Sequence, residues 1–218
     1  MDVRSKAPSK RRKISATSQI EHAQRTVRTE ESRELLEPSE DDGTQSFDDE
    51  GDVGVLRTWR AMCPELQRRW HEDEQPEDWV GVTMENGRVV KLKLMLKCLT
   101  GAVPAEIGQL AALKELVLGN KLTSLPAELW QLTSLTVLSL HGNQLTSLPA
   151  EIGQLASLEQ LVLSENQLTS VPAEIGQLTS LRRLYLDANQ LTSLPAAIRE
   201  LRAAGCEVYV DDGVTFDE

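Results

Sequence analysis

The residue types that most enzymes use for catalysis are scarce and scattered in this chain of 218 residues. Its three histidines, His22, His71 and His141, lie far apart in the sequence. No serine or cysteine stands in a nucleophile motif, and no glycine-rich phosphate-binding loop follows a strand pattern. We therefore expect that the protein is not an enzyme and that it has no cofactor and no small-molecule substrate.

Cysteine usage and hydropathy indicate where the protein works. Cys63, Cys98 and Cys206 are odd in number and widely spaced, which is typical neither of a disulfide framework nor of a metal-binding CxxC pair. The N-terminus has no apolar signal-peptide core. The longest stretch without Asp, Glu, Lys or Arg, 129–150, is too polar for a membrane span. The sequence predicts an intracellular protein without a membrane span, located in the cytoplasm or the nucleus.

The net charge of −11 is unevenly distributed. Residues 1–33 hold nine Lys/Arg and four Asp/Glu, a sum of +5, whereas residues 34–52 hold nine acids and no base. Because residues 1–52 have no hydrophobic periodicity and few large apolar side chains, we expect them to form a disordered arm. The acidic remainder of the chain disfavours nucleic acid as a partner, except through this arm.

A run of four bases stands in the arm, consisting of Lys10, Arg11, Arg12 and Lys13. Such a run resembles a monopartite nuclear-import signal. Contact with another anion, such as lipid or RNA, and simple solvation are the alternatives that the sequence leaves open.

Internal repetition dominates the rest of the chain. LTSLPAEIGQLASL at 145–158 and LTSVPAEIGQLTSL at 168–181 are identical at 12 of 14 positions, and the chain holds 33 leucines. Five units of 22 to 24 residues begin at Val89, Leu113, Leu135, Leu158 and Leu181. A unit of this size cannot bury its own leucine face, so the units must stack against one another.

The unit pattern LxxLxLxxNxLxxLPxxIxxLxx resembles the leucine-rich-repeat superfamily. The resemblance implies an α/β fold, a short right-handed solenoid arc with a parallel β-sheet on its concave side. The stretch DWVGVTMENGRVVKLKL at 78–94 resembles the N-terminal cap of plant-type repeats, and LTGAVP at 99–104 resembles their first repeat. Met84 stands where extracellular caps usually carry a cysteine, which fits a reducing compartment.

The predicted organisation has four parts. After the arm at 1–52, residues 53–88 form a cap of helices and a hairpin, in which Pro64 separates two helices and Asn86-Gly87 makes the turn. Five repeats occupy 89–204, and a C-terminal cap with an acidic tail occupies 205–218.

An asparagine recurs at the corner after each strand of the later units, at Asn120, Asn143, Asn166 and Asn189. A buried amide there can satisfy backbone groups of neighbouring turns, as in the asparagine ladder of the family. We interpret these four residues as structural.

The outward side of the predicted sheet is the candidate binding surface, because strand side chains alternate between faces. We call it the sheet face. Its residues differ from strand to strand, whereas the return segments are nearly copied. They are Lys91, Lys93, Glu115, Val117, Val137, Ser139, His141, Gln160, Val162, Ser164, Glu165, Arg183, Tyr185 and Asp187.

The sequence thus predicts a protein–protein interaction module. The LPxEIGxL phrasing resembles the intracellular class of Ras-suppressor and Ras-pathway scaffold proteins, which implies a signalling scaffold or adaptor with a partner from a small-GTPase pathway. Two alternatives stay open. One is a nuclear adaptor or regulatory subunit addressed by the basic arm, and the other is a structural repeat module without a dedicated partner.

Overall fold

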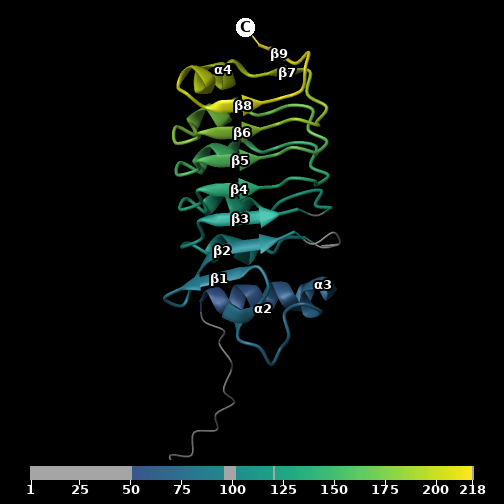
Figure 1. The fold of residues 1–218 in the computed structure, drawn as a ribbon, viewed down its shortest axis with the longest axis vertical. Coiled ribbons are helices and arrows are strands. Elements are labelled where there is room, and N and C mark those ends of the chain that lie inside the picture. The colour runs from purple at the N-terminus through teal and green to yellow at the C-terminus, as the bar shows by residue number, and fades with distance from the viewer. Residues whose placement is uncertain (1–50, 96–101, 120, 218) are drawn as a thin grey trace, which may run out of the picture. The chain divides into compact units, whose positions relative to one another are not determined.

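The computed structural model describes residues 51–95, 102–119 and 121–217, which all belong to one compact unit. The basic run at 10–13, Cys98 and Asn120 lie outside these described residues. Within the unit, coils are stacked so that their strands lie side by side on one side and short helices on the other (Figure 1).

The main sheet has seven strands in the order β1-β2-β3-β4-β5-β6-β8. Strands β2 to β6 and β8 pair in parallel, whereas β1 pairs antiparallel with β2. The bounds are β1 Val82–Glu85, β2 Arg88–Leu94, β3 Glu115–Leu118, β4 Val137–Ser139, β5 Gln160–Val162, β6 Arg183–Tyr185 and β8 Glu207–Tyr209. The predicted α/β solenoid is therefore confirmed, and β8 extends its parallel sheet beyond the five repeats.

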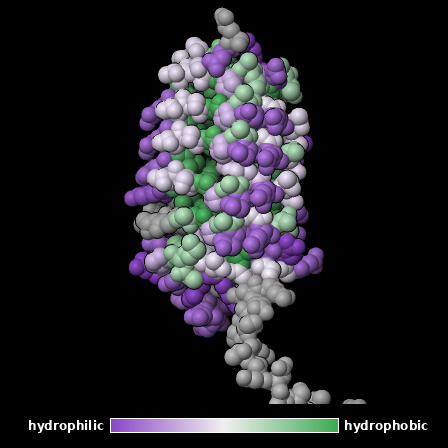
Figure 2. All heavy atoms as spheres, turned by 180° about the vertical axis from the view of Figure 1, so that it is seen from behind, coloured by the Kyte–Doolittle hydropathy of each residue, from purple (hydrophilic) through white to green (hydrophobic). Residues whose placement is uncertain are grey.

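Each of the strands β2 to β5 is followed by a short 3-10 helix on the opposite side of the coil. These return helices are η2 Ala105–Gln109, η3 Ala127–Gln131, η4 Ala150–Gln154 and η5 Ala173–Gln177. The inward leucines of the strands, such as Leu138 and Leu161, are fully buried between the strands and these helices. Figure 2 shows the unit from behind, with hydrophilic and hydrophobic residues in rows along the stack, because successive coils repeat one surface.

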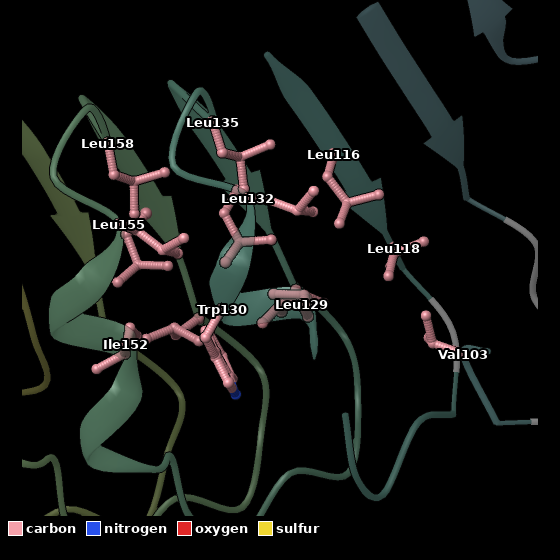
Figure 3. Close-up of a cluster of buried hydrophobic side chains, with 14 of the residues drawn as sticks. Val103, Leu116, Leu118, Leu129, Trp130, Leu132, Leu135, Ile152, Leu155 and Leu158 are labelled. Carbon is pink, nitrogen blue, oxygen red and sulfur yellow. The ribbon is translucent and has the colours of Figure 1, made fainter. Parts of the chain in front are cut away.

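Trp130 on η3 stands where the sister helices carry glycine. Only 2% of its surface is exposed, and Figure 3 shows it among the buried leucines beside Ile152 of the next coil. At Gly153 an added Cβ would lie 2.8 Å from the carbonyl oxygen of Glu174, so that pair of coils is stacked too closely for a side chain. Three of these return helices therefore pack closely on the next coil through a glycine, whereas η3 places the buried side chain of Trp130 at the same position.

The N-terminal cap consists of α2 Asp52–Met62, α3 Pro64–Gln67, η1 Pro76–Asp78 and the hairpin of β1 and β2. The two helices separated at Pro64 and the hairpin turn at Asn86-Gly87 are confirmed, and both turn residues have positive φ. Helix α2 begins at Asp52, the last residue that the sequence assigned to the arm. Its buried carboxylate accepts hydrogen bonds from the backbone N–H of Val89 (2.7 Å) and from Arg88 Nε (2.9 Å).

The C-terminal end differs from the expected acidic tail. After α4 Ala196–Ala203 and β8, the chain turns back so that β9 Thr215–Phe216 pairs with β7 Ser193–Leu194. Phe216 packs against the core, and the guanidinium carbons of Arg199 and Arg202 lie 5.6 and 5.7 Å from its ring centroid. The packing of Phe216 and its contacts with two arginines therefore fix the segment that the sequence predicts to be a solvated acidic tail.

The recurring asparagines link adjacent coils through their side-chain amides. Asn166 Nδ2 donates to the carbonyl oxygens of Leu140 and Leu163, both at 2.9 Å, and its Oδ1 accepts from the N–H of Leu145 at 3.1 Å. Asn143 and Asn189 make the same three kinds of contact in their own coils. Each amide therefore satisfies backbone groups that turn away from the sheet at the corner.

Replacing Asn166 with alanine should lower the free energy of unfolding by about 3 kcal/mol, because three buried backbone groups lose their partner. Urea unfolding followed by circular dichroism measures the loss. Gln167→Ala is the matched control, since its exposed side chain neighbours the ladder without joining it, and it should change stability by less than about 0.5 kcal/mol. Equal effects of the two substitutions would contradict a structural role for the ladder.

Candidate protein-binding surface

The parallel register aligns the outward side chains of the sheet in rows across the strands. The first row is Lys91, Glu115, Val137, Gln160, Arg183 and Glu207. The second row is Lys93, Val117, Ser139, Val162, Tyr185 and Tyr209. All of these residues are exposed or half-buried, whereas the leucines between them are buried. The structure thus brings the predicted residues of these two rows together on one face.

The N-terminal end of the sheet face carries an excess of positive charge. The ammonium groups of Lys91 and Lys93 lie 3.6 and 2.7 Å from the carboxylate of Glu115. Both lysine side chains remain about half exposed, at 46% and 51%. Two cations thus share one anion, and one positive charge is left for a partner.

The middle of the sheet face is apolar and uncharged. Val117, Val137, Ser139 and Val162 are each half-buried, so their outer surfaces reach solvent. Isolated exposed valines are normal in strands, but these three lie on the adjacent strands β3, β4 and β5, and Ser139 is the register partner of both Val117 and Val162. They give a partner an uncharged and mostly apolar contact between two charged ends.

The C-terminal end of the sheet face is aromatic and charged. The rings of Tyr185 and Tyr209 are stacked, with centroids 4.6 Å apart and planes 4° from parallel. Arg183 lies beside them and pairs with Glu207, with Nε 3.6 Å from the carboxylate. The Tyr209 hydroxyl donates a hydrogen bond of 3.2 Å to the same carboxylate.

The predicted site omitted Tyr209 and Glu207. Their signal was present in the sequence, because GCEVYV at 205–210 alternates as a strand does and places both residues on one face. They were missed because β8 lies after the last leucine repeat, so no consensus position marks them.

Ser164 does not belong to the accessible surface that the sequence predicts. It is 6% exposed, and its hydroxyl donates a hydrogen bond of 2.7 Å to Asp187. Strand β5 ends at Val162, so the strict alternation of faces no longer holds two residues later. Ser164 instead positions the carboxylate of Asp187, which stays half-buried at the edge of the sheet face.

The corner after the strands adds a further polar contact to the sheet face. His141 Nε2 lies 3.8 Å from the carboxylate of Glu165, and the side chain of Glu165 is exposed whereas His141 is half-buried. Glu165 has a positive φ of 57°, and Gly142 and Ala188 have positive φ at the same position of the neighbouring coils. The turn geometry is thus shared between coils, whereas the side chain that it presents differs.

No metal centre accompanies these residues. Within 51–95, 102–119 and 121–217, no group of three or more His, Cys, Asp or Glu side chains could hold a metal ion. Over the same residues, no helix combines the length and the apolar character that crossing a membrane requires.

Family models identify the repeats themselves. A leucine-rich-repeat model matches residues 133–191, and a second, for two leucine-rich repeats, matches 111–154. Together with the parallel sheet and the short return helices, these matches define the fold as a leucine-rich-repeat solenoid. No curated protein matches the chain closely in sequence.

Solved structures of plant proteins share the fold. The ectodomain of the Arabidopsis thaliana receptor kinase SOBIR1 is 24% identical with a TM-score of 0.60, over 76% of this chain and 95% of that one. A structure of the A. thaliana BIR3–SERK2 complex is 26% identical with a TM-score of 0.60, over 75% and 94%. The ectodomain of A. thaliana GASSHO1/SCHENGEN3, in complex with CASPARIAN STRIP INTEGRITY FACTOR 2, is 28% identical with a TM-score of 0.64, but only 21% of its length is covered.

The pKa of Tyr209 gives a direct readout of the C-terminal end of the sheet face. The hydrogen bond to Glu207, together with the negative charge of that carboxylate, raises this pKa above its ordinary value of 10.0. In a Tyr185→Phe background, where Tyr209 is the remaining tyrosine, Glu207→Gln should therefore lower the pKa of Tyr209. Absorbance-detected titration of the phenol measures the change. An unchanged or higher pKa would contradict the contact between Tyr209 and Glu207.

Proposed function

We propose that this chain is a non-catalytic protein-binding module that holds a protein partner on the sheet face. One observation carries the proposal. Within the same short strands, the inward positions repeat as buried leucine, whereas the outward positions differ in nearly every coil. A solenoid needs only the inward set for its stability, so variety confined to the outward set is what a specific recognition surface requires.

The structural neighbours support the class of function. The solved structures of the BIR3–SERK2 complex and of the GASSHO1/SCHENGEN3 ectodomain with CASPARIAN STRIP INTEGRITY FACTOR 2 are both complexes, so proteins of similar fold bind partners. Each structure is similar to about three quarters of the present chain.

The size of the sheet face limits how a partner binds. Five steps of about 4.8 Å separate β2 from β8, which gives a width of about 24 Å. A standard interface buries about 800 Å² on each partner, more than short strands of this width supply. The partner therefore also contacts the corner side chains that adjoin the sheet face, among them the exposed Glu165 and the half-buried His141.

Substitutions on the sheet face test the proposal. The triple variant Val137→Asp/Val162→Asp/Tyr185→Ala places two charges in the apolar middle and removes half of the aromatic stack. Affinity capture from native lysate should recover a protein with the wild-type bait and lose it with the triple variant, by at least about tenfold.

A matched control separates the sheet face from other surfaces. Thr133→Asp/Ala156→Asp/Thr179→Ala makes the same kinds of change at exposed turn positions between return helices and strands. This control should capture the partner as well as wild type does, and circular dichroism confirms that all baits are folded. If the sheet-face triple also retains every partner, the chain is either a structural repeat module or one that binds through another surface.

We further propose an intracellular location and a signalling role. The location is supported by Met84 at the cap position where extracellular relatives carry cysteine, and by Cys63 and Cys206, which are buried and form no disulfide. The role as a scaffold or adaptor, with a partner from a small-GTPase pathway, is supported by the LPxEIGxL phrasing of the repeats. In the alternative, a nuclear adaptor, the basic arm addresses the protein to the nucleus.

The basic run decides between the two locations. If Lys10, Arg11, Arg12 and Lys13 form an import signal, replacing all four by alanine should shift the fluorescently tagged full chain from nucleus to cytoplasm. The control replaces four scattered arm bases, Arg4, Lys6, Arg25 and Arg28, and should leave the distribution unchanged. A wild-type chain that is already cytoplasmic would rule out the nuclear adaptor.

A further inference from the structure

The stacked pair of tyrosines at the C-terminal end of the sheet face has one ring face without a neighbouring strand. Tyr185 fills one side of the Tyr209 ring at 4.6 Å. β8 is the terminal strand of its sheet, so no further strand of that sheet covers the other side. Tyr209 is 45% exposed, which makes it one of the few large hydrophobic side chains that the described part of the chain leaves open to solvent.

The charges around this open ring favour a cation. Glu207 lies in the first row of the sheet face, next to the second row that holds Tyr209, and Asp187 and Asp211 lie two residues beyond the ends of β6 and β8. Arg183 neutralises one of these three carboxylates through its pair with Glu207. Asp211 accepts from the backbone N–H groups of Ala188 (3.0 Å) and Asn189 (3.4 Å), which fixes its position without cancelling its charge.

A planar cation fits this arrangement better than other ligands do. A guanidinium can stack on the tyrosine ring and donate to a carboxylate at the ring edge at the same time. An ammonium is a compact, strongly hydrated charge without a plane to stack. A phosphate or a nucleic-acid backbone is repelled by the carboxylates.

We propose that the open face of Tyr209 binds an arginine side chain in an extended segment of the protein partner, with Asp187 and Asp211 as its anionic neighbours. This proposal rests on the proposed function and names the chemistry of the partner. The segment crosses the apolar middle and brings an acidic residue to Lys91 and Lys93 at the other end. Those ends lie about 24 Å apart, which an extended chain spans in about seven residues at about 3.3 Å per residue.

A random ten-residue peptide library displayed on phage, selected on the full chain, tests the proposal. The selected peptides should carry an arginine, with an acidic residue about seven positions away. The best peptide is then synthesised with a fluorophore, and its Kd is measured by fluorescence anisotropy. Replacing its arginine by citrulline, which keeps the shape and removes the charge, should weaken binding by about tenfold, and replacement by lysine should weaken it several-fold.

Two variants of Tyr209 test whether its aromatic ring is what binds the arginine of the peptide. Tyr209→Ala removes the stacking surface and should weaken binding of the arginine peptide by about tenfold. Tyr209→Phe keeps the ring and loses only the bond to Glu207, so its Kd should stay within about threefold of wild type. Circular dichroism confirms that both variants are folded.

Specific outcomes overturn the proposal. They are selected peptides without arginine, no selected peptides at all, or a Kd that Tyr209→Ala leaves unchanged. If a peptide is lost on Val137→Asp/Val162→Asp but insensitive to Tyr209→Ala, the sheet face binds proteins and the arginine site is wrong. If Tyr209→Ala weakens the peptide while the sheet-face triple still captures every lysate partner, the arginine site stands and the wider proposed function fails.

Discussion

The structure depends on the burial of leucines that no single coil can cover. Each inward leucine of a strand needs the next coil above it, so burial couples neighbours and makes the unit a stack rather than a set of independent turns. The two ends of such a stack expose an apolar face unless something else covers them. Helix α2 covers one end and is tied to the hairpin through Asp52, and the return of the chain through β9 and Phe216 covers the other.

Because the inward side chains stabilise the fold, the outward side chains of the sheet are free to vary. Stability is carried by the leucines and the asparagine amides, so residues such as Val137 or Gln160 can change without disturbing either. The result is a narrow face with a distinct character at each end, two lysines sharing Glu115 at one and a tyrosine stack among carboxylates at the other. A partner that contacts both ends of the sheet face is bound in one orientation, because the reversed orientation would bring like charges together.

Repetition also decides what the sequence could predict. Leucine spacing fixed the coil period, the parallel sheet and the two outward rows, because each inference was repeated in several units. The inferences failed where the repeat ends or the strand stops. Tyr209 and Phe216 follow the last unit, so no sister position placed Tyr209 on the sheet face or Phe216 against the core. Ser164 lies beyond the end of β5, and its hydrogen bond to Asp187 depends on contact between two coils, which the pattern within one coil does not contain.

The central claim is that a protein partner lies on the sheet face, and amide chemical-shift mapping of the labelled chain with its captured partner tests it most directly. The account predicts that the largest perturbations fall on β2 to β6, β8 and the adjoining corners. The return helices η2 to η5 should be nearly unaffected. Perturbations concentrated on those helices, with the strands unchanged, would contradict the account.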